Sequence, residues 1–88
     1  MAALIDTVVV MPVFEDREAS SRLFAELRKV LGDGLFVVPV DDGSVRQPVE
    51  VAALEAAGVQ GEVIRLRRNV GHQRAIAIGL SQIGRAHV

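Results

Sequence analysis

Residues 35–44 of this 88-residue chain, LFVVPVDDGS, contain the pattern from which the other elements can be placed. Its apolar run leads directly into two adjacent carboxylates, Asp41 and Asp42, and then into a glycine and a serine. A short apolar run bounded by turn residues is typical of a strand buried on both faces. In open α/β sheets, ligands bind at the carboxyl ends of such strands. The stretch therefore predicts a buried strand, residues 35–41, that brings two acids to a candidate binding edge.

A strand and a helix are expected before this stretch. Residues 7–13 are β-branched and apolar, which predicts a first buried strand. From residue 17 to residue 31, apolar side chains recur at the spacing of one helix face. Asp16 is expected to cap this helix through its carboxylate, and Gly32 is expected to end it in a left-handed conformation.

Two helices and one strand are expected after it. Pro48 suits the first turn of a second helix, which ends at Gly58. Residues 62–66 alternate between apolar and charged side chains, as a third and more exposed strand would. Asn69 is expected to cap a third helix over residues 71–82. This helix is apolar almost all round, so we expect it to be covered on most sides.

The order of these elements predicts one α/β domain, built from a three-stranded parallel sheet and three helices. Right-handed crossovers give the strand order 3-2-1, with residues 35–41 in the centre. Pro39 is disfavoured in a central strand because it removes a ladder hydrogen bond. Either a local bulge accommodates its nitrogen, or this strand lies nearer an edge of the sheet.

Composition limits the classes of function. The net charge of −1 offers no strong field for nucleic acid or an anionic membrane, and three Phe are the only aromatic residues available for stacking on bases. The absence of cysteine excludes disulfides and thiolate metal sites and fits a reducing compartment. No apolar run approaches the roughly 20 residues of a spanning helix, and the N-terminus lacks the basic start of a signal peptide. The sequence thus favours a cytoplasmic domain without nucleic-acid or membrane contacts.

Three segments are expected to converge at the carboxyl edge of the sheet: residues 12–16, 41–44 and 68–73. They bring acids, glycines, a cation, an imidazole and a helix N-terminus, which stabilises anions. This combination suits a nucleotide, because acids accept from its base and ribose while the helix N-terminus favours its phosphates. Each element also has a simpler interpretation. Taken alone, Asp-Asp-Gly-Ser is more typical of a turn with a helix cap, the arginines of a solvated face, and His72 of a surface position. Only the convergence of the three segments favours a binding site.

Three motifs, MPVFED, VDDGS and RNVGHQRAIAIGL, occur in this order along residues 7–82. They resemble the N-terminal half of the family 2 glycosyltransferases, and the last motif is most similar to the branch of dolichol- and polyprenyl-phosphate sugar transferases. The resemblance implies the N-terminal, Rossmann-like half of a nucleotide-binding domain with the GT-A fold. It also implies transfer of a sugar from a nucleotide-sugar donor to an acceptor, for which a lipid phosphate is one candidate. The alternative is a small non-catalytic α/β module that binds a nucleotide or a protein.

The resemblance also implies which residues bind the nucleotide. They are Pro12, Phe14, Asp16, Asp41, Asp42, Arg68, Gly71 and His72. The first motif departs from the family pattern, since Phe14 stands in place of a Tyr and loses its hydroxyl contact. Glu15 and Asp16 stand in place of Asn and Glu. His72 stands where many members have Lys, which weakens the expected phosphate contact.

The rest of the family's machinery is not expected in this chain. In the family, an Asp-x-Asp motif after the fourth strand holds a divalent cation, Mg²⁺ or Mn²⁺, and the catalytic base and acceptor site lie further on. The sequence contains none of these motifs, so we assign no catalytic or metal-binding residue and expect no transfer by this chain alone. Membrane association of the intact protein would depend on such further segments.

The last six residues, IGRAHV at 83–88, are expected to be non-native. The bases ATCGGAAGAGCACACGTC encode them, and these bases resemble a widely used short-read sequencing adapter whose next triplet, TGA, is a stop. On this hypothesis residues 1–82 are part of a glycosyltransferase nucleotide-binding domain, and residues 83–88 are an adapter-derived tail. The alternative is a natural helix end with Gly84 as its cap.

Overall fold

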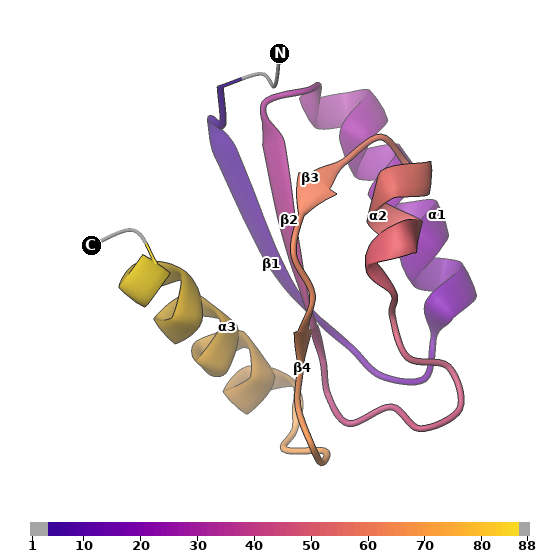
Figure 1. Cartoon of the computed structure of the whole chain (residues 1–88), viewed down its shortest axis with the longest axis vertical. Helices are drawn as coiled ribbons and strands as arrows, with labels where there is room; N and C mark the ends of the chain where they lie inside the picture. The colour runs from indigo at the N-terminus through magenta and orange to yellow at the C-terminus, as the bar shows by residue number, and fades with distance from the viewer. Residues whose placement is uncertain (1–3, 87–88) are drawn as a thin grey trace.

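A parallel sheet forms the centre of the structure (Figure 1), a computed structural model that describes residues 4–86. Strands β1 (Thr7–Val13) and β2 (Leu35–Asp41) pair in parallel along their whole lengths. Two very short strands, β3 (Gln60–Gly61) and β4 (Ile64–Arg65), pair in parallel with the other side of β2. The predicted parallel sheet with the second strand in the centre is therefore confirmed.

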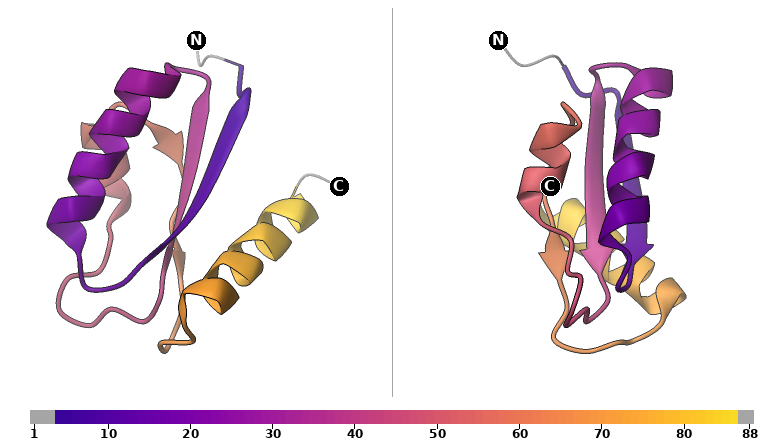
Figure 2. Two further views of the ribbon diagram at one scale, coloured as in Figure 1. Left: turned by 180° about the vertical axis from the view of Figure 1, so that it is seen from behind. Right: turned by 90° about the vertical axis from the view of Figure 1, so that its right-hand side faces the viewer.

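Helices lie on both sides of the sheet, as Figures 1 and 2 show. Helices α1 (Arg17–Leu31) and α2 (Val51–Ala56) share one side, and α3 (His72–Ala86) lies on the other. The chain therefore has the predicted α/β architecture with three helices.

Side chains of β2 enter both layers because they alternate between the faces of the strand. Leu35 and Val37 pack with Phe24 of α1 and Leu54 of α2 in the main core, and all four are almost completely buried. This core is what holds α1 and α2 against the sheet.

Helix α3 approaches the opposite face through Gly79. A Cβ atom at this position would lie 2.6 Å from Cγ2 of Val40 and 2.8 Å from Cγ1 of Val10, so only glycine allows this contact. Ala75 is buried on the same helix, whereas Leu80 is 55% exposed. The prediction that α3 is covered on most sides is therefore wrong for the described residues, because the sheet covers only one face of the helix.

The predicted third strand, residues 62–66, is wrong in its bounds. Pairing with β2 begins earlier, at Gln60, and the strand is interrupted at Glu62 and Val63 between β3 and β4, although the N–H of Glu62 still bonds to β2. The register with β2 is the same on both sides of this break, so no residue is inserted and the break is not a bulge.

This break explains Pro39. The N–H groups of Glu62 and Leu66 donate to the carbonyl oxygens of Val37 (3.2 Å) and Asp41 (2.9 Å), so alternate residues of β2 face β3 and β4. Pro39 is one of these alternate residues of β2. Its nitrogen, which carries no hydrogen, therefore faces the break between β3 and β4. Neither sequence-based explanation holds, since the strand is central and its register is unbroken.

The helices end near the predicted residues, but the capping hydrogen bonds and backbone angles there differ from those expected. Asp16 occupies the N-cap of α1, but its carboxylate makes no capping hydrogen bond, which corrects the prediction. Gly32 ends α1 with a positive φ of 79° and an extended ψ of −164°, so it is not in the left-handed helical conformation expected. Pro48 lies ahead of α2 rather than in its first turn, because the chain remains extended through Glu50.

The last helix is longer than predicted. Helix α3 continues beyond residue 82 and includes residues 83–86 of the segment expected to be a non-native tail, while residues 87 and 88 lie outside the described part of the chain. No helix within residues 4–86 combines the length and hydropathy needed to cross a bilayer.

Candidate functional site

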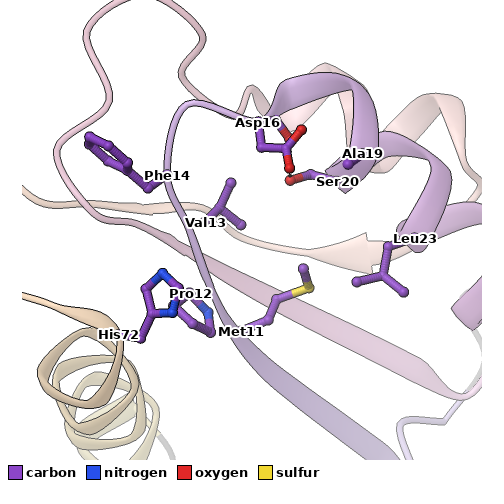
Figure 3. A pocket seen from close by; sticks show the side chains of 9 residues that line it. All are labelled: Met11, Pro12, Val13, Phe14, Asp16, Ala19, Ser20, Leu23 and His72. Atoms are coloured by element: carbon purple, nitrogen blue, oxygen red, sulfur yellow. Dashed lines mark hydrogen bonds between the residues drawn. The ribbon is translucent and has the colours of Figure 1, made fainter.

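A cavity of about 250 Å³ lies at the carboxyl end of β1 (Figure 3). Its walls come from the end of β1 and the loop that follows, from the first turns of α1, and from the start of α3. The lining residues are Met11, Pro12, Val13, Phe14, Asp16, Ala19, Ser20, Leu23 and His72. The cavity therefore has an apolar floor with an aromatic ring, a carboxylate and an imidazole around it.

Four of the eight predicted nucleotide-binding residues line this cavity: Pro12, Phe14, Asp16 and His72. In Figure 3, Phe14 and His72 lie on one side of the β1 ribbon, and Asp16 lies on the other, beside Ser20. Phe14 is 43% exposed, and Asp16 and His72 are also exposed, so a ligand can reach all three. The hydroxyl of Ser20 already donates to the carbonyl oxygen of Asp16, at 2.7 Å.

Asp42 follows the carboxyl end of β2, as expected, and its carboxylate binds the chain itself. Its side chain is completely buried, and its two carboxylate oxygens accept the N–H groups of Val70 (2.7 Å) and Gly71 (3.0 Å) just before α3. Its carbonyl oxygen accepts from Nδ2 of Asn69 at 3.3 Å. The group that satisfies the backbone before α3 is therefore Asp42, and the prediction that Asn69 caps this helix is wrong.

Asp41 is equally enclosed. Its carboxylate oxygens accept the N–H groups of Ser44 (2.8 Å) and Val49 (2.8 Å), and the side chain is completely buried. The guanidinium of Arg65 lies 4.0 Å from the same carboxylate and donates to the carbonyl oxygen of Val49 at 2.7 Å. Asp41 thus fixes both ends of the loop between β2 and α2. In this structure the two adjacent acids bind backbone N–H groups, which is the turn-and-cap interpretation of the motif.

Gly43 allows the loops after β2 and β4 to touch. Its φ is +83°, and a Cβ atom there would lie 2.6 Å from the backbone carbon of Arg68 and from the nitrogen of Asn69. No other residue type fits this contact without moving one of the loops. Arg68 and Gly71 are brought close to the aspartate motif by this packing, although neither lines the cavity. Arg68 is exposed on the loop surface.

Glu15 is the residue of the site that the sequence interpretation missed. It has a φ of 48°, and its carboxylate accepts the N–H groups of Val45 (3.0 Å), Arg46 (3.0 and 3.2 Å) and Gln47 (2.7 Å). These hydrogen bonds, first from Val45 and then from Gln47, lower the pKa of Glu15 from its ordinary value of 4.5, and the charge of Arg46 adds to the effect. The only signal in the sequence was that Glu15 departs from the Asn of the motif that MPVFED resembles.

The described residues hold no group of three or more potential metal ligands among His, Cys, Asp and Glu. The buried acids at the end of β2 do not fit a cation, because all four carboxylate oxygens already accept backbone N–H groups. No step of a reaction is therefore assigned to a metal held by these residues.

No protein-family model matches this chain, and no curated protein does either. The observations that bear on function are therefore the parallel sheet, the cavity beside β1 and the loops that surround it.

Proposed function

We propose that this chain is the donor-nucleotide-binding part of a sugar-nucleotide-dependent glycosyltransferase, with the Rossmann-like half of a GT-A domain. The observation that carries the proposal is the cavity at the carboxyl end of β1, which Phe14, Asp16 and His72 all line. Phe14 and Asp16 belong to the first of the motifs that resemble family 2 and His72 belongs to the last, and these two motifs lie far apart in the sequence. Their convergence at the ligand-binding edge of a parallel sheet supports the proposal.

The chemistry of the cavity suits a nucleoside better than a purely apolar ligand. The exposed ring of Phe14 offers a face for stacking on a base. The carboxylate of Asp16 accepts hydrogen bonds from base N–H or ribose O–H groups. A volume of about 250 Å³ is below the usual range for a whole drug-sized ligand, about 300–1,000 Å³. The cavity therefore fits one part of a nucleotide, and the diphosphate would lie over its rim.

The start of α3 and the loop before it are the segments that would contact a diphosphate. His72 lies at the start of α3, where the helix N-terminus stabilises negative charge. Arg68 is exposed on the loop leading to the same helix, and a guanidinium is well suited to phosphate oxygens. In this proposal Asp41 and Asp42 hold the binding loops in place and do not contact the ligand.

A second candidate is a binding module without chemistry, which holds a protein partner at the same cavity. The observation in its favour is the largely apolar floor formed by Met11, Val13 and Leu23, next to the outer edge of β1. Among residues 4–86, β1 pairs only with β2, so an extended segment of a partner could add to the sheet there.

Titration of the 88-residue chain with UDP, GDP and their sugars distinguishes the two candidates. We expect saturable binding of at least one nucleotide, weakened about tenfold or more by Phe14→Ala, since stacking on an aromatic ring contributes about 1–3 kcal/mol per base. The matched control is Val30→Ala, an exposed apolar residue of α1 outside the cavity lining. A folded sample that binds none of these ligands contradicts the nucleotide proposal and favours the module.

A further inference from the structure

Glu15 is the point at which the backbone turns between two residues of the cavity wall. Phe14 and Asp16 both line the cavity, whereas Glu15 between them does not. Its φ of 48° lies in the left-handed region, which a residue other than glycine adopts at a cost. Such a conformation persists only where the surroundings hold it in place.

The surroundings that hold Glu15 come from one segment, residues 44–47. Its carboxylate accepts the three consecutive N–H groups of Val45, Arg46 and Gln47, over distances of 2.7–3.2 Å. Its own N–H donates to Oγ of Ser44 at 2.7 Å. Both the backbone and the side chain of Glu15 are thus tied to the loop after β2.

We infer that Glu15 is a positioning residue for the ligand cavity: by binding the amides of residues 45–47, its carboxylate keeps Phe14 and Asp16 on the cavity wall. The inference rests on the proposed function only for the identity of the ligand as a nucleotide. Glu15 itself does not touch the ligand. Its effect on binding comes from the direction in which the chain leaves β1.

A carboxylate is needed at this position for a physical reason. Two ionised oxygens offer acceptor sites for three amide donors, whereas a glutamine has one acceptor oxygen and would turn its NH₂ group toward N–H groups. Glutamine has the same shape, so Glu15→Gln removes the acceptors and the charge with little change in volume.

The charged groups around Glu15 favour its ionised form. Arg46 lies on the facing loop and helps to lower the pKa of Glu15. Arg17 also reaches this loop, with its Nε donating to the carbonyl oxygen of Pro48 at 3.1 Å. Asp16, next to Glu15 in the chain, adds a negative charge that acts in the opposite direction. Protonation in acid is therefore expected to loosen the contact.

The first measurement is a pH titration of the ligand-free chain, followed by the amide resonances of residues 45–47 in two-dimensional NMR. In the wild type, the three amides should shift together, with one midpoint below the ordinary Glu value of 4.5. The shift should vanish in Glu15→Gln and remain in Glu26→Gln, the matched control with an exposed glutamate of α1. Separate midpoints for the three amides overturn the inference, and this result does not depend on how the Gln variant folds.

The second measurement follows the cavity itself. In Glu15→Gln the ring resonances of Phe14 should move, and the Kd for UDP or GDP should rise about tenfold or more, because small displacements of positioned groups have large effects. Glu15→Asp keeps a carboxylate on a shorter side chain and should restore part of the affinity. Unmoved Phe14 resonances or an unchanged Kd overturn the inference. If the wild type binds neither nucleotide, the proposed function fails, while the amide titration and the Phe14 resonances still decide the role of Glu15.

Discussion

Replacing Asp42 with alanine tests whether its carboxylate serves the fold. In the structure this completely buried carboxylate accepts two backbone N–H groups, from Val70 at 2.7 Å and Gly71 at 3.0 Å. A hydrogen bond to a charged group contributes about 1.5–3 kcal/mol, so two of them correspond to about 3–6 kcal/mol. Val70 and Gly71 are partly exposed, so water is expected to reach them in the variant, which places the expected loss at the lower end, about 3 kcal/mol.

This loss is large for a chain of this size. A domain of 88 residues has a free energy of unfolding of about 4–13 kcal/mol, at roughly 0.05–0.15 kcal/mol per residue. Asp42→Asn keeps one acceptor oxygen and should therefore lose less, about 2 kcal/mol. Asp33→Ala is the matched control, because Asp33 is exposed in the turn after α1 and should change stability by less than about 0.5 kcal/mol.

The assay is urea denaturation followed by far-ultraviolet circular dichroism, with linear extrapolation to water and a comparison of m values. A loss of less than about 1 kcal/mol in Asp42→Ala, at an unchanged m value, would refute the assignment of this carboxylate to the loop before α3. The result also decides how binding data are interpreted. If Asp42→Ala is destabilised as expected, weaker nucleotide binding by this variant says nothing about a direct contact, and Phe14→Ala becomes the informative variant.

Three further predictions concern the loops, the pH dependence and the open edge of the sheet. Gly43→Ala should destabilise the fold by more than about 2 kcal/mol in urea denaturation, because its Cβ would meet the backbone of Arg68. Gly58→Ala, with a φ of 71° and open space around the added Cβ, should lose only about 1 kcal/mol, and equal losses would contradict the steric argument. Because the pKa of Glu15 is lowered, its contribution to stability is complete above pH 4.5 and is lost as the pH falls through the lowered pKa. The difference in unfolding free energy between the wild type and Glu15→Gln should therefore narrow below pH 4.5. A difference that stays constant down to about pH 3 would contradict this linkage. Val8 is partly exposed on β1, whose outer edge has no strand partner within residues 4–86. We therefore expect concentration-dependent self-association of the chain in sedimentation velocity and weaker association of Val8→Lys; a wild type that stays monomeric, or a variant that associates equally, would contradict this.

The elements that could be predicted from the sequence are those whose own residues determine them. Strands β1 and β2 and helix α1 have the predicted bounds, because a β-branched apolar run, a buried run and a helical apolar spacing each occur between clear turn residues. The central place of β2 followed from the handedness of the crossovers. These features depend on local pattern and on general rules of topology.

The elements after β2 depend on contacts that are distant in sequence. Helix α2 begins later than Pro48 suggests because Val49, completely buried, donates its N–H to the carboxylate of Asp41 and keeps the chain extended. The third strand divides into β3 and β4 where Pro39 of β2 offers no donor. In each case a side chain or a missing N–H on β2 determines the geometry of a later segment. The residue pattern within that later segment therefore cannot predict where its helix begins or where its strand is interrupted.

In the candidate site, too, the residue types could be predicted from the sequence, whereas their contacts could not. Adjacent carboxylates after a buried strand are compatible with ligand binding and with loop anchoring, and only the position of the surrounding N–H groups distinguishes the two. In this structure those N–H groups belong to the chain itself, so Asp41 and Asp42 shape the site, and the groups free to meet a ligand are Phe14, Asp16 and His72. Anchored loops also reduce the conformational entropy that binding must overcome. The buried acids therefore support ligand binding indirectly, by holding exposed groups in place, and the variants that best test function are those that leave these acids unchanged.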